Sequence, residues 1–410
     1  MSYELEALLP KPPVILPFLI VAYALASLLT MDMYLPAMPT LERVLQTTPG
    51  QVQLTMTVYL IGFAFSQLLY GPLSDRYGRR PVMLLGGLGF VIATILCAVS
   101  TTIEILIAAR FLQGLTIGSL TVTCRATLRE LYEPKRGTKL LAYISMAEGL
   151  SLAAGPIIGA EILLLAGWRW TFWVVAILAG SALIGLFFAL PESNRRKNSQ
   201  ALHLRPLLTI FGRLLTTRRF IGYALPGGCA FAGLMAYYTV GSFLLRDAGL
   251  TPREFSQMQA IVVIAYLSGL GASSRLVERF GFGRLIVGGF ATVAIGALSM
   301  PALAFAGIDG VWAIVVPLAV YAVGIGSSMA PLIMLALSVN PAATGTVAAT
   351  FGMLTMSIGG LGSLTAHLAY NGHVLSLAIP VACMAILSVV FFALLRPRRL
   401  LSGDTVATGN

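Results

Sequence analysis

The feature that most limits how this chain can fold is a series of apolar stretches, each about 20 residues long, that recurs from end to end. A helix of about 20 apolar residues crosses the hydrocarbon core of a bilayer, because each residue adds about 1.5 Å of length. Hydrophobic residues make up 57% of the 410 residues and charged residues only 10%, whereas about a quarter of an average soluble protein is charged. We therefore predict an all-α integral membrane protein.

Twelve stretches are long and apolar enough to be transmembrane helices. They are expected near residues 14–36, 51–70, 81–99, 103–124, 140–166, 169–190, 220–245, 255–277, 284–306, 310–333, 344–369 and 374–395. The sequence contains no soluble domain, no nucleotide-phosphate motif and no His/Asp cluster at an interface. A membrane enzyme or receptor is therefore the weakest of the functional alternatives, and we predict that the protein is not an enzyme.

The positions of the basic residues predict the orientation of these helices. If the N-terminus is cytoplasmic, 22 of the 27 Lys and Arg residues lie on the inner side and four on the outer side, while Arg110 lies within a helix. Basic residues are enriched in cytoplasmic loops, so both termini are predicted to be cytoplasmic. The net charge of +11 is thus a topology signal, and we predict no nucleic-acid partner.

The longest polar interval, residues 191–206, divides the helices into two sets of six. We predict an N-terminal six-helix bundle over residues 1–190, a cytoplasmic linker over 191–219 and a C-terminal six-helix bundle over 220–410. Two equivalent bundles with a binding site near the midplane between them are typical of secondary transporters built from repeats. The sequence therefore favours a transporter.

The ten residues GPLSDRYGRR, 71 to 80, separate the second and third apolar stretches. We expect Gly71 and Pro72 to end one helix, Gly78 to adopt a positive φ, and the next helix to begin at Pro81. Asp75 can pair with the neighbouring arginines or accept hydrogen bonds from a helix N-terminus.

A weaker copy of this loop, Glu278, Arg279 and Gly281, follows the eighth stretch. The loop itself resembles the signature between helices 2 and 3 of the major facilitator superfamily, GxLaDRxGRrxx. This resemblance implies the two-bundle facilitator fold and alternating access. It also implies that Asp75, Arg76 and Arg80 stabilise an inner contact between the bundles in the outward-open state. The conformational gate is accordingly predicted to contain Gly71, Asp75, Arg76, Gly78, Arg79 and Arg80.

Ionisable residues inside the membrane are the candidates for function, because each costs about 2.5–3.5 kcal/mol at a helix centre on the insertion scale. Asp32, Arg110, Glu148 and Glu161 are of this kind. Asp32 and Arg110 lie at similar depths below the outer ends of their helices, so they could meet. Two interpretations remain open: a structural ion pair, or an acid that binds a proton in apolar surroundings and releases it when Arg110 or water approaches. Glu161 is near the outer end of its helix and is interpreted as interfacial.

Three further motifs resemble those of twelve-helix drug/proton antiporters, a group that includes the bicyclomycin and chloramphenicol exporters. RFLQGLTIGS contains Arg110, which the resemblance links to proton coupling, and DMYLPAMP begins at Asp32. The third motif, GPxxG, consists of Gly155, Pro156 and Gly159 and is found in facilitator antiporters. Pro156 weakens the helix backbone while the two glycines admit a neighbouring helix. We include these three residues in the predicted gate.

A second acid contributes to substrate choice in one multidrug member of that group, and Ala24 occupies its position here. Glu148 lies on roughly the same helix face as Gly155 and is our candidate for the acid that replaces the one absent at Ala24. We predict a role for it in proton coupling as well as in substrate binding. The alternative is that hydrogen bonds to a neighbouring helix satisfy the Glu148 carboxyl group. Methionine and aromatic side chains adapt to varied apolar ligands, and carboxylates attract cations. The predicted substrate-binding residues are Asp32, Glu148, Leu28, Met31, Ile117, Tyr237 and Tyr238.

The leading prediction is a proton-coupled antiporter that exports lipophilic cationic or neutral drugs by alternating access. The alternative is a proton-driven exporter of one endogenous metabolite, such as a siderophore, sugar or peptide. In either case the partners are a small-molecule substrate, protons and the lipid bilayer. The proton gradient supplies the energy without a cofactor or metal. We expect a monomer in the bacterial inner membrane.

Overall fold

The computed structural model describes residues 13–194, 197, 204–308, 310–340 and 344–395. Within these ranges the chain is helical, and eleven helices are long and apolar enough to cross a membrane. The helices are α2 (Leu16–Asp32), η1 (Leu35–Ala37), α3 (Met38–Val44), α4 (Pro49–Tyr77), α5 (Arg79–Val99), α6 (Ile103–Thr116), α7 (Gly118–Leu131), α8 (Pro134–Ala166), α9 (Trp168–Ala189), α10 (Leu204–Thr216), α11 (Arg218–Asp247), α12 (Pro252–Phe305), α13 (Val311–Leu337), α14 (Thr344–Ala369) and α15 (Leu375–Leu395).

The eleven helices correspond to twelve spans because α12 is broken at Gly281. That residue has φ 73° and ψ 166°, outside the helical region, so the 54-residue α12 consists of two helices that meet at this point. Gly78 separates α4 from α5 with φ 108°. Both positive φ values are ones that glycine adopts at little cost. The two copies of the loop motif thus make the same kind of backbone break.

The prediction that Gly71 and Pro72 end a helix was wrong. Helix α4 continues through Pro72 to Tyr77, and its C-cap is Gly78. A proline removes one helical hydrogen bond without ending the helix when the surrounding packing holds the two turns in line. Similarly, the outer part of the first span continues beyond residue 36 as α3.

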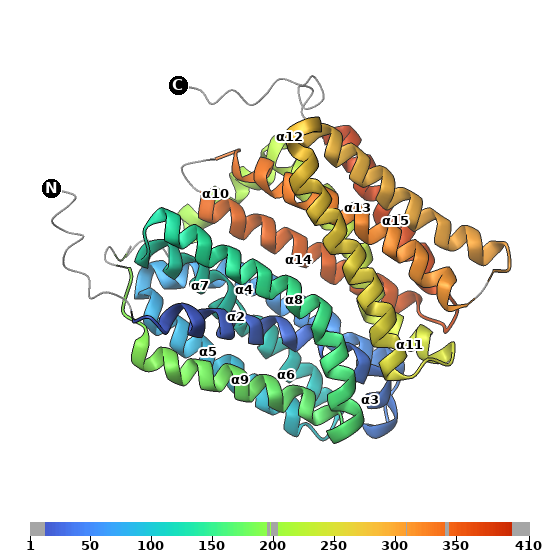
Figure 1. Cartoon of the computed structure of the whole chain (residues 1–410), viewed down its shortest axis with the longest axis horizontal. Coiled ribbons are helices and arrows are strands. Elements are labelled where there is room, and N and C mark those ends of the chain that lie inside the picture. The colour runs from blue at the N-terminus through green and yellow to red at the C-terminus, as the bar shows by residue number, and fades with distance from the viewer. Residues whose placement is uncertain (1–12, 195–196, 198–203, 309, 341–343, 396–410) are drawn as a thin grey trace.

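Two groups of helices make up the molecule, α2 to α9 and α11 to α15 (Figure 1). Helix α4 packs against α14 and α8 packs against α12 across the boundary between the groups. The fold is therefore the predicted all-α arrangement of twelve spans in two six-helix bundles. Within the N-terminal bundle, α4 and α6 approach closely because Gly62 and Gly114 leave no side chain between their backbones.

The sequence boundaries of the bundles remain a prediction. The predicted linker, 191–219, contains α10, while residues 195–196 and 198–203 lie outside the described part of the chain. Residues 1–12 and 396–410 lie outside it as well. The inner and outer sides named below are those predicted from the distribution of Lys and Arg.

Candidate functional site

Asp32 is the last residue of α2 and is buried against α8, with 3% of its surface exposed. Its carboxylate accepts a hydrogen bond of 3.1 Å from the Ser151 hydroxyl. Gly155 lies directly opposite, where an added Cβ would be 2.5 Å from the Cβ of Asp32. No ion pair to Asp32 is present among the described residues. A charged Asp32 would therefore have little to replace its lost hydration.

The GPxxG segment of α8 contacts both bundles. Gly155 and Gly159 leave space for Asp32 and for the backbone of Met33, so α8 lies against α2 without intervening side chains. One residue further along, the Pro156 carbonyl accepts a hydrogen bond of 2.9 Å from Ser256 of α12, in the other bundle. The same turn of α8 therefore touches the buried acid and the opposite bundle.

Arg110 of α6 is completely buried and its guanidinium lies over aromatic rings. Its Cζ atom is 4.2 Å from the ring centre of Tyr59 and 4.5 Å from that of Tyr34. The guanidinium also donates to Gln113 Oε1 at 2.7 Å and to the Thr30 carbonyl at 3.4 Å. Cation–π contacts and hydrogen bonds thus stabilise the charge in place of a carboxylate.

The structure does not pair Asp32 with Arg110, although their depths suggested that they could meet. Asp32 and Arg110 are nevertheless both close enough to Tyr59 to interact electrostatically with its hydroxyl group. Depth along a helix does not fix the direction of a side chain around it, and the aromatic rings hold Arg110 on its own. The ion-pair interpretation therefore does not describe this conformation.

Glu148 lies two turns before Gly155 on α8 and forms an ion pair with Arg125 of α7. About a quarter of its side chain is exposed, 28%. It is also close enough to Tyr266 of α12 for the two groups to interact electrostatically. The residue therefore lies between α7 and the opposite bundle, on the inner side of Asp32.

The other predicted substrate-binding residues differ in how deeply they are buried. Tyr237, Tyr238 and Ile117 are buried, and Leu28 and Met31 are half-buried. Tyr238 is close enough to Asp32 for the two groups to interact electrostatically, whereas the Tyr237 hydroxyl has no hydrogen-bond partner in the part of the chain that the structure describes.

Sequence reasoning missed Gln259 of α12. Its side chain is fully buried beside Tyr238, but neither amide atom satisfies hydrogen-bond geometry with a described group. It lies one turn further inside than Ser256, at the boundary between the bundles. An uncharged amide in an apolar segment gives no sequence signal comparable to a buried carboxylate.

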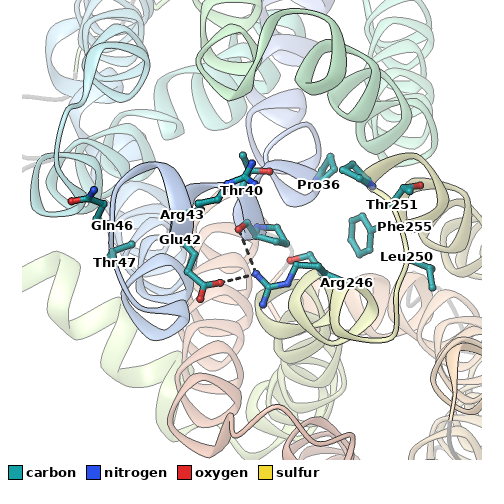
Figure 2. A pocket seen from close by; sticks show the side chains of 13 residues that line it. Pro36, Thr40, Glu42, Arg43, Gln46, Thr47, Arg246, Leu250, Thr251 and Phe255 are labelled. Atoms are coloured by element: carbon teal, nitrogen blue, oxygen red, sulfur yellow. Dashed lines mark hydrogen bonds and ion pairs between the residues drawn. The ribbon is translucent and has the colours of Figure 1, made fainter.

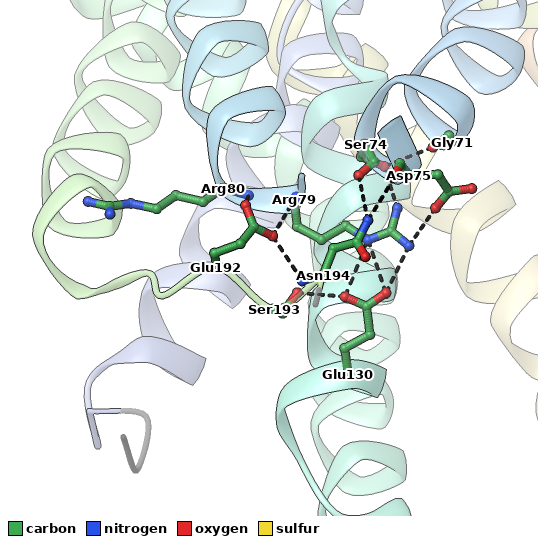
Figure 3. Close-up of polar contacts among 9 residues, drawn as sticks. All are labelled: Gly71, Ser74, Asp75, Arg79, Arg80, Glu130, Glu192, Ser193 and Asn194. Carbon is green, nitrogen blue, oxygen red and sulfur yellow. Dashed lines mark hydrogen bonds and ion pairs between the residues drawn. The ribbon is translucent and has the colours of Figure 1, made fainter. Parts of the chain in front are cut away.

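The inner loop is organised by Arg79, whose guanidinium contacts three polar side chains (Figure 3). It pairs with Asp75 at 2.7 Å and with Glu130 at 2.8 Å, and it donates to the Ser74 hydroxyl. Asn194, beyond α9, donates to the carbonyls of Ser74 and Asp75.

The remaining loop residues also contact their own half of the chain. Arg80 donates to the Phe187 carbonyl, Arg76 lies over the Tyr77 ring, and Glu192 accepts from the backbone N–H groups of Arg79 and Arg80. The Gly71 carbonyl accepts a hydrogen bond of 3.0 Å from the Ser74 hydroxyl. All these contacts fall within the N-terminal bundle and the start of the linker.

Ion pairs between the bundles are found at the outer end. Arg246 of α11 pairs with Glu42 of α3 at 2.6 Å (Figure 2), and Arg253 of α12 pairs with Glu161 of α8 at 2.6 Å. These pairs, with the Ser256 hydrogen bond, hold the outer ends of the described helices together. We refer to this conformation as outer-closed. Glu161, interpreted from sequence as interfacial, thus contributes to an inter-bundle contact.

Twelve spans in two bundles, with a buried acid at their boundary, define a membrane transporter. The family model of the Major Facilitator Superfamily matches residues 20–364. The chain belongs to this superfamily, as the loop motif predicted.

The sequence matches individual relatives over nearly the whole length of the chain. The sequence is 31% identical over 379 residues to the multidrug transporter MdfA of Yersinia pestis bv. Antiqua (strain Angola), a match that covers 90% of each chain. It is 30% identical over 397 residues to the uncharacterized MFS-type transporter YdgK of Bacillus subtilis (strain 168), covering 95% of this chain and 97% of YdgK. The resemblance to the drug antiporters is thus confirmed at the level of sequence relatives.

Among solved structures, a D-xylose-proton symporter superimposes with a TM-score of 0.76 at 19% identity, covering 94% of this chain and 98% of that one. At this identity the likeness concerns the fold. The fold and the relatives are those of multi-pass membrane transporters rather than enzymes.

Proposed function

We propose that the protein is a proton-coupled antiporter that exports lipophilic cationic or neutral drugs by alternating access. In this proposal protons moving inward drive substrate outward, and the protein acts as a monomer in the bacterial inner membrane with both termini cytoplasmic. The observation that carries the proposal concerns one turn of α8. Gly155 in this turn contacts Asp32, and the next residue, Pro156, accepts a hydrogen bond from Ser256 of the other bundle.

Opening of the outer side would couple bundle movement to the surroundings of Asp32. In the outer-closed conformation, α12 is held against α8 at Pro156, and Asp32 is sealed beneath. Separation of α12 from α8 breaks the Ser256 hydrogen bond and admits water from outside to the turn that covers Asp32. A carboxyl whose access to water changes between two conformations can take up a proton on one side and release it on the other.

Arg110 has a supporting role in this proposal. A buried cation with no carboxylate partner raises the local potential, which favours the charged form of an acid in the same region. The rings of Tyr34 and Tyr59 hold the guanidinium in position. A modest movement of α2 or α6 would therefore change the field at Asp32 without moving a charge through the membrane.

The proposed substrate class rests on the surroundings of Asp32 and on similarity to MdfA. Asp32 offers negative charge to a cation, and Glu148 offers it where the cation replaces Arg125, while the buried amide of Gln259 offers hydrogen bonds to a neutral molecule. Apolar and aromatic side chains supply the remaining surface. A site of this mixed kind accepts amphiphiles of either type.

Everted membrane vesicles with an imposed pH gradient test the proposal. Lipophilic cations, chloramphenicol-like neutral compounds and siderophores are added in turn, and substrate-induced proton release is recorded. We expect responses to several chemically different drugs. A response to a single metabolite with none to any drug would instead support the endogenous-metabolite alternative and overturn the multidrug proposal.

A further inference from the structure

A cavity lies at the outer end of the molecule, on the boundary between the bundles (Figure 2). Its volume is about 710 Å³, within the range of small-molecule binding sites. One wall is formed by η1, α3 and the turn that follows, and the other by the ends of α11 and α12 with the loop between them. Asp32 does not line it, so the cavity is separate from the site described above.

The apolar and polar parts of this cavity are distinct. Pro36 and Phe255 are buried side chains that form an apolar surface with Leu250 and Pro252. Ser242 lines the cavity from α11 and is only 3% exposed, and its hydroxyl has no hydrogen-bond partner among the described residues. A buried hydroxyl without a partner is costly unless a ligand or water satisfies it.

The charges of the cavity favour an anion. Glu42 is neutralised by Arg246 at 2.6 Å, and Arg246 also pairs with Asp247 at 2.9 Å. Arg43 lines the cavity from α3 and forms no ion pair or hydrogen bond in the described part of the chain. Among the charged side chains that line the cavity, Arg43 and Arg246 outnumber Glu42, so the lining carries a net positive charge.

We propose that this outer cavity binds an amphiphilic monoanion, such as a carboxylate or sulfonate with an apolar chain. Its anionic group pairs with Arg43, an oxygen accepts from Ser242, and its chain lies on Pro36 and Phe255. Arg43 belongs to the N-terminal bundle and Ser242 to the C-terminal bundle. A ligand that contacts both walls is bound only while the outer side is closed, and it therefore stabilises that conformation and inhibits transport from outside.

Three probes with the same chain and different headgroups test the site: octanesulfonate, octyl glucoside and octyltrimethylammonium. Each is added to the outer face of proteoliposomes that contain the full-length protein, and to the purified protein in nanodiscs for thermal unfolding. We expect the sulfonate alone to raise the unfolding temperature and inhibit transport. The unfolding measurement does not depend on transport, so this inference and the proposed function can fail separately.

Variants of Arg43 separate the site from the partitioning of the probes into lipid. Arg43→Gln should weaken the effect of the sulfonate about tenfold, because a charge-assisted hydrogen bond is lost, and Arg43→Lys should retain most of it. Ser242→Ala should weaken it by a smaller factor. Transport without the probe should be unchanged in Arg43→Gln. Equal effects of the three headgroups, or an unchanged response in Arg43→Gln, would overturn the proposal.

Discussion

Ser256→Ala removes the hydrogen bond that joins α12 to the GPxxG turn of α8. Ser256 is 1% exposed and donates to the Pro156 carbonyl at 2.9 Å, but it shares that proton with the Pro252 carbonyl of its own helix, also at 2.9 Å. A net hydrogen bond contributes about 1 kcal/mol, so the variant should shift the equilibrium toward the outer-open conformation by up to about fivefold. The Pro156 carbonyl lies within α8, where it also accepts a helical hydrogen bond, so the loss of the Ser256 hydroxyl does not leave this carbonyl unpaired.

Distances between spin labels across the outer end measure this equilibrium. Labels at Val44 and Ile308, one in each bundle and both exposed, are introduced after the exposed Cys383 has been replaced by Ser. The variant should increase the population with the longer distance, in the presence and absence of a pH gradient.

A matched control lies on the same helix. Ser268 is exposed, and among the described residues it donates only to the Ala265 carbonyl of its own helix, so Ser268→Ala should leave the distances unchanged. An unchanged distribution in Ser256→Ala, or an equal shift in both variants, would refute the argument that the Pro156 contact holds the outer side closed.

Four further predictions concern individual residues. Glu148→Gln should lower transport of cationic drugs about fivefold and spare neutral ones, because a single partly exposed charge contributes about 1 kcal/mol; uptake assays that show equal losses would indicate a coupling role. Arg79→Gln should destabilise the protein by about 1 kcal/mol, because Asp75 and Glu130 lose their ion pairs but remain partly exposed to solvent, and an unchanged unfolding temperature would argue against the inner-loop network. Arg110→Lys should lose pH-gradient-driven transport while the protein remains folded, because lysine keeps the charge without the planar stacking; normal transport by this variant would contradict the role of the aromatic rings. Gly159→Ala should impair transport, because the added methyl group would force α8 away from the backbone of Met33. Gly149→Ala is the control, since there is space for a methyl group at that position and transport should be unchanged. Equal activity of the two variants in the same assay would contradict the packing argument.

The sequence predicted the helices well because the bilayer imposes their length and composition. All twelve predicted spans have counterparts in the structure, and Gly78 and Gly281 break the backbone where the loop motifs occur. The end of the second helix was misplaced, because Pro72 weakens only one turn of α4 while packing on both sides maintains the helix.

The candidate site was less predictable, since it depends on which helices lie side by side. Asp32 and Arg110 stood out as charges in apolar segments, but their separate environments require the ring of Tyr34, from the turn after α2, and the ring of Tyr59, from α4. The pairing of Glu161 with Arg253 joins residues 92 positions apart. Such contacts are set by tertiary packing, which periodicity and depth do not encode.

The central claim is that Asp32 carries the proton, and its most direct test is pH-gradient-driven drug export by Asp32→Asn in proteoliposomes, with drug binding measured on the same preparation. Glu104→Gln, which alters an exposed carboxylate at the start of α6, serves as the control. We predict that Asp32→Asn binds neutral drug but shows no export in response to the gradient, while the control exports normally. Full gradient-driven export by Asp32→Asn would contradict the account.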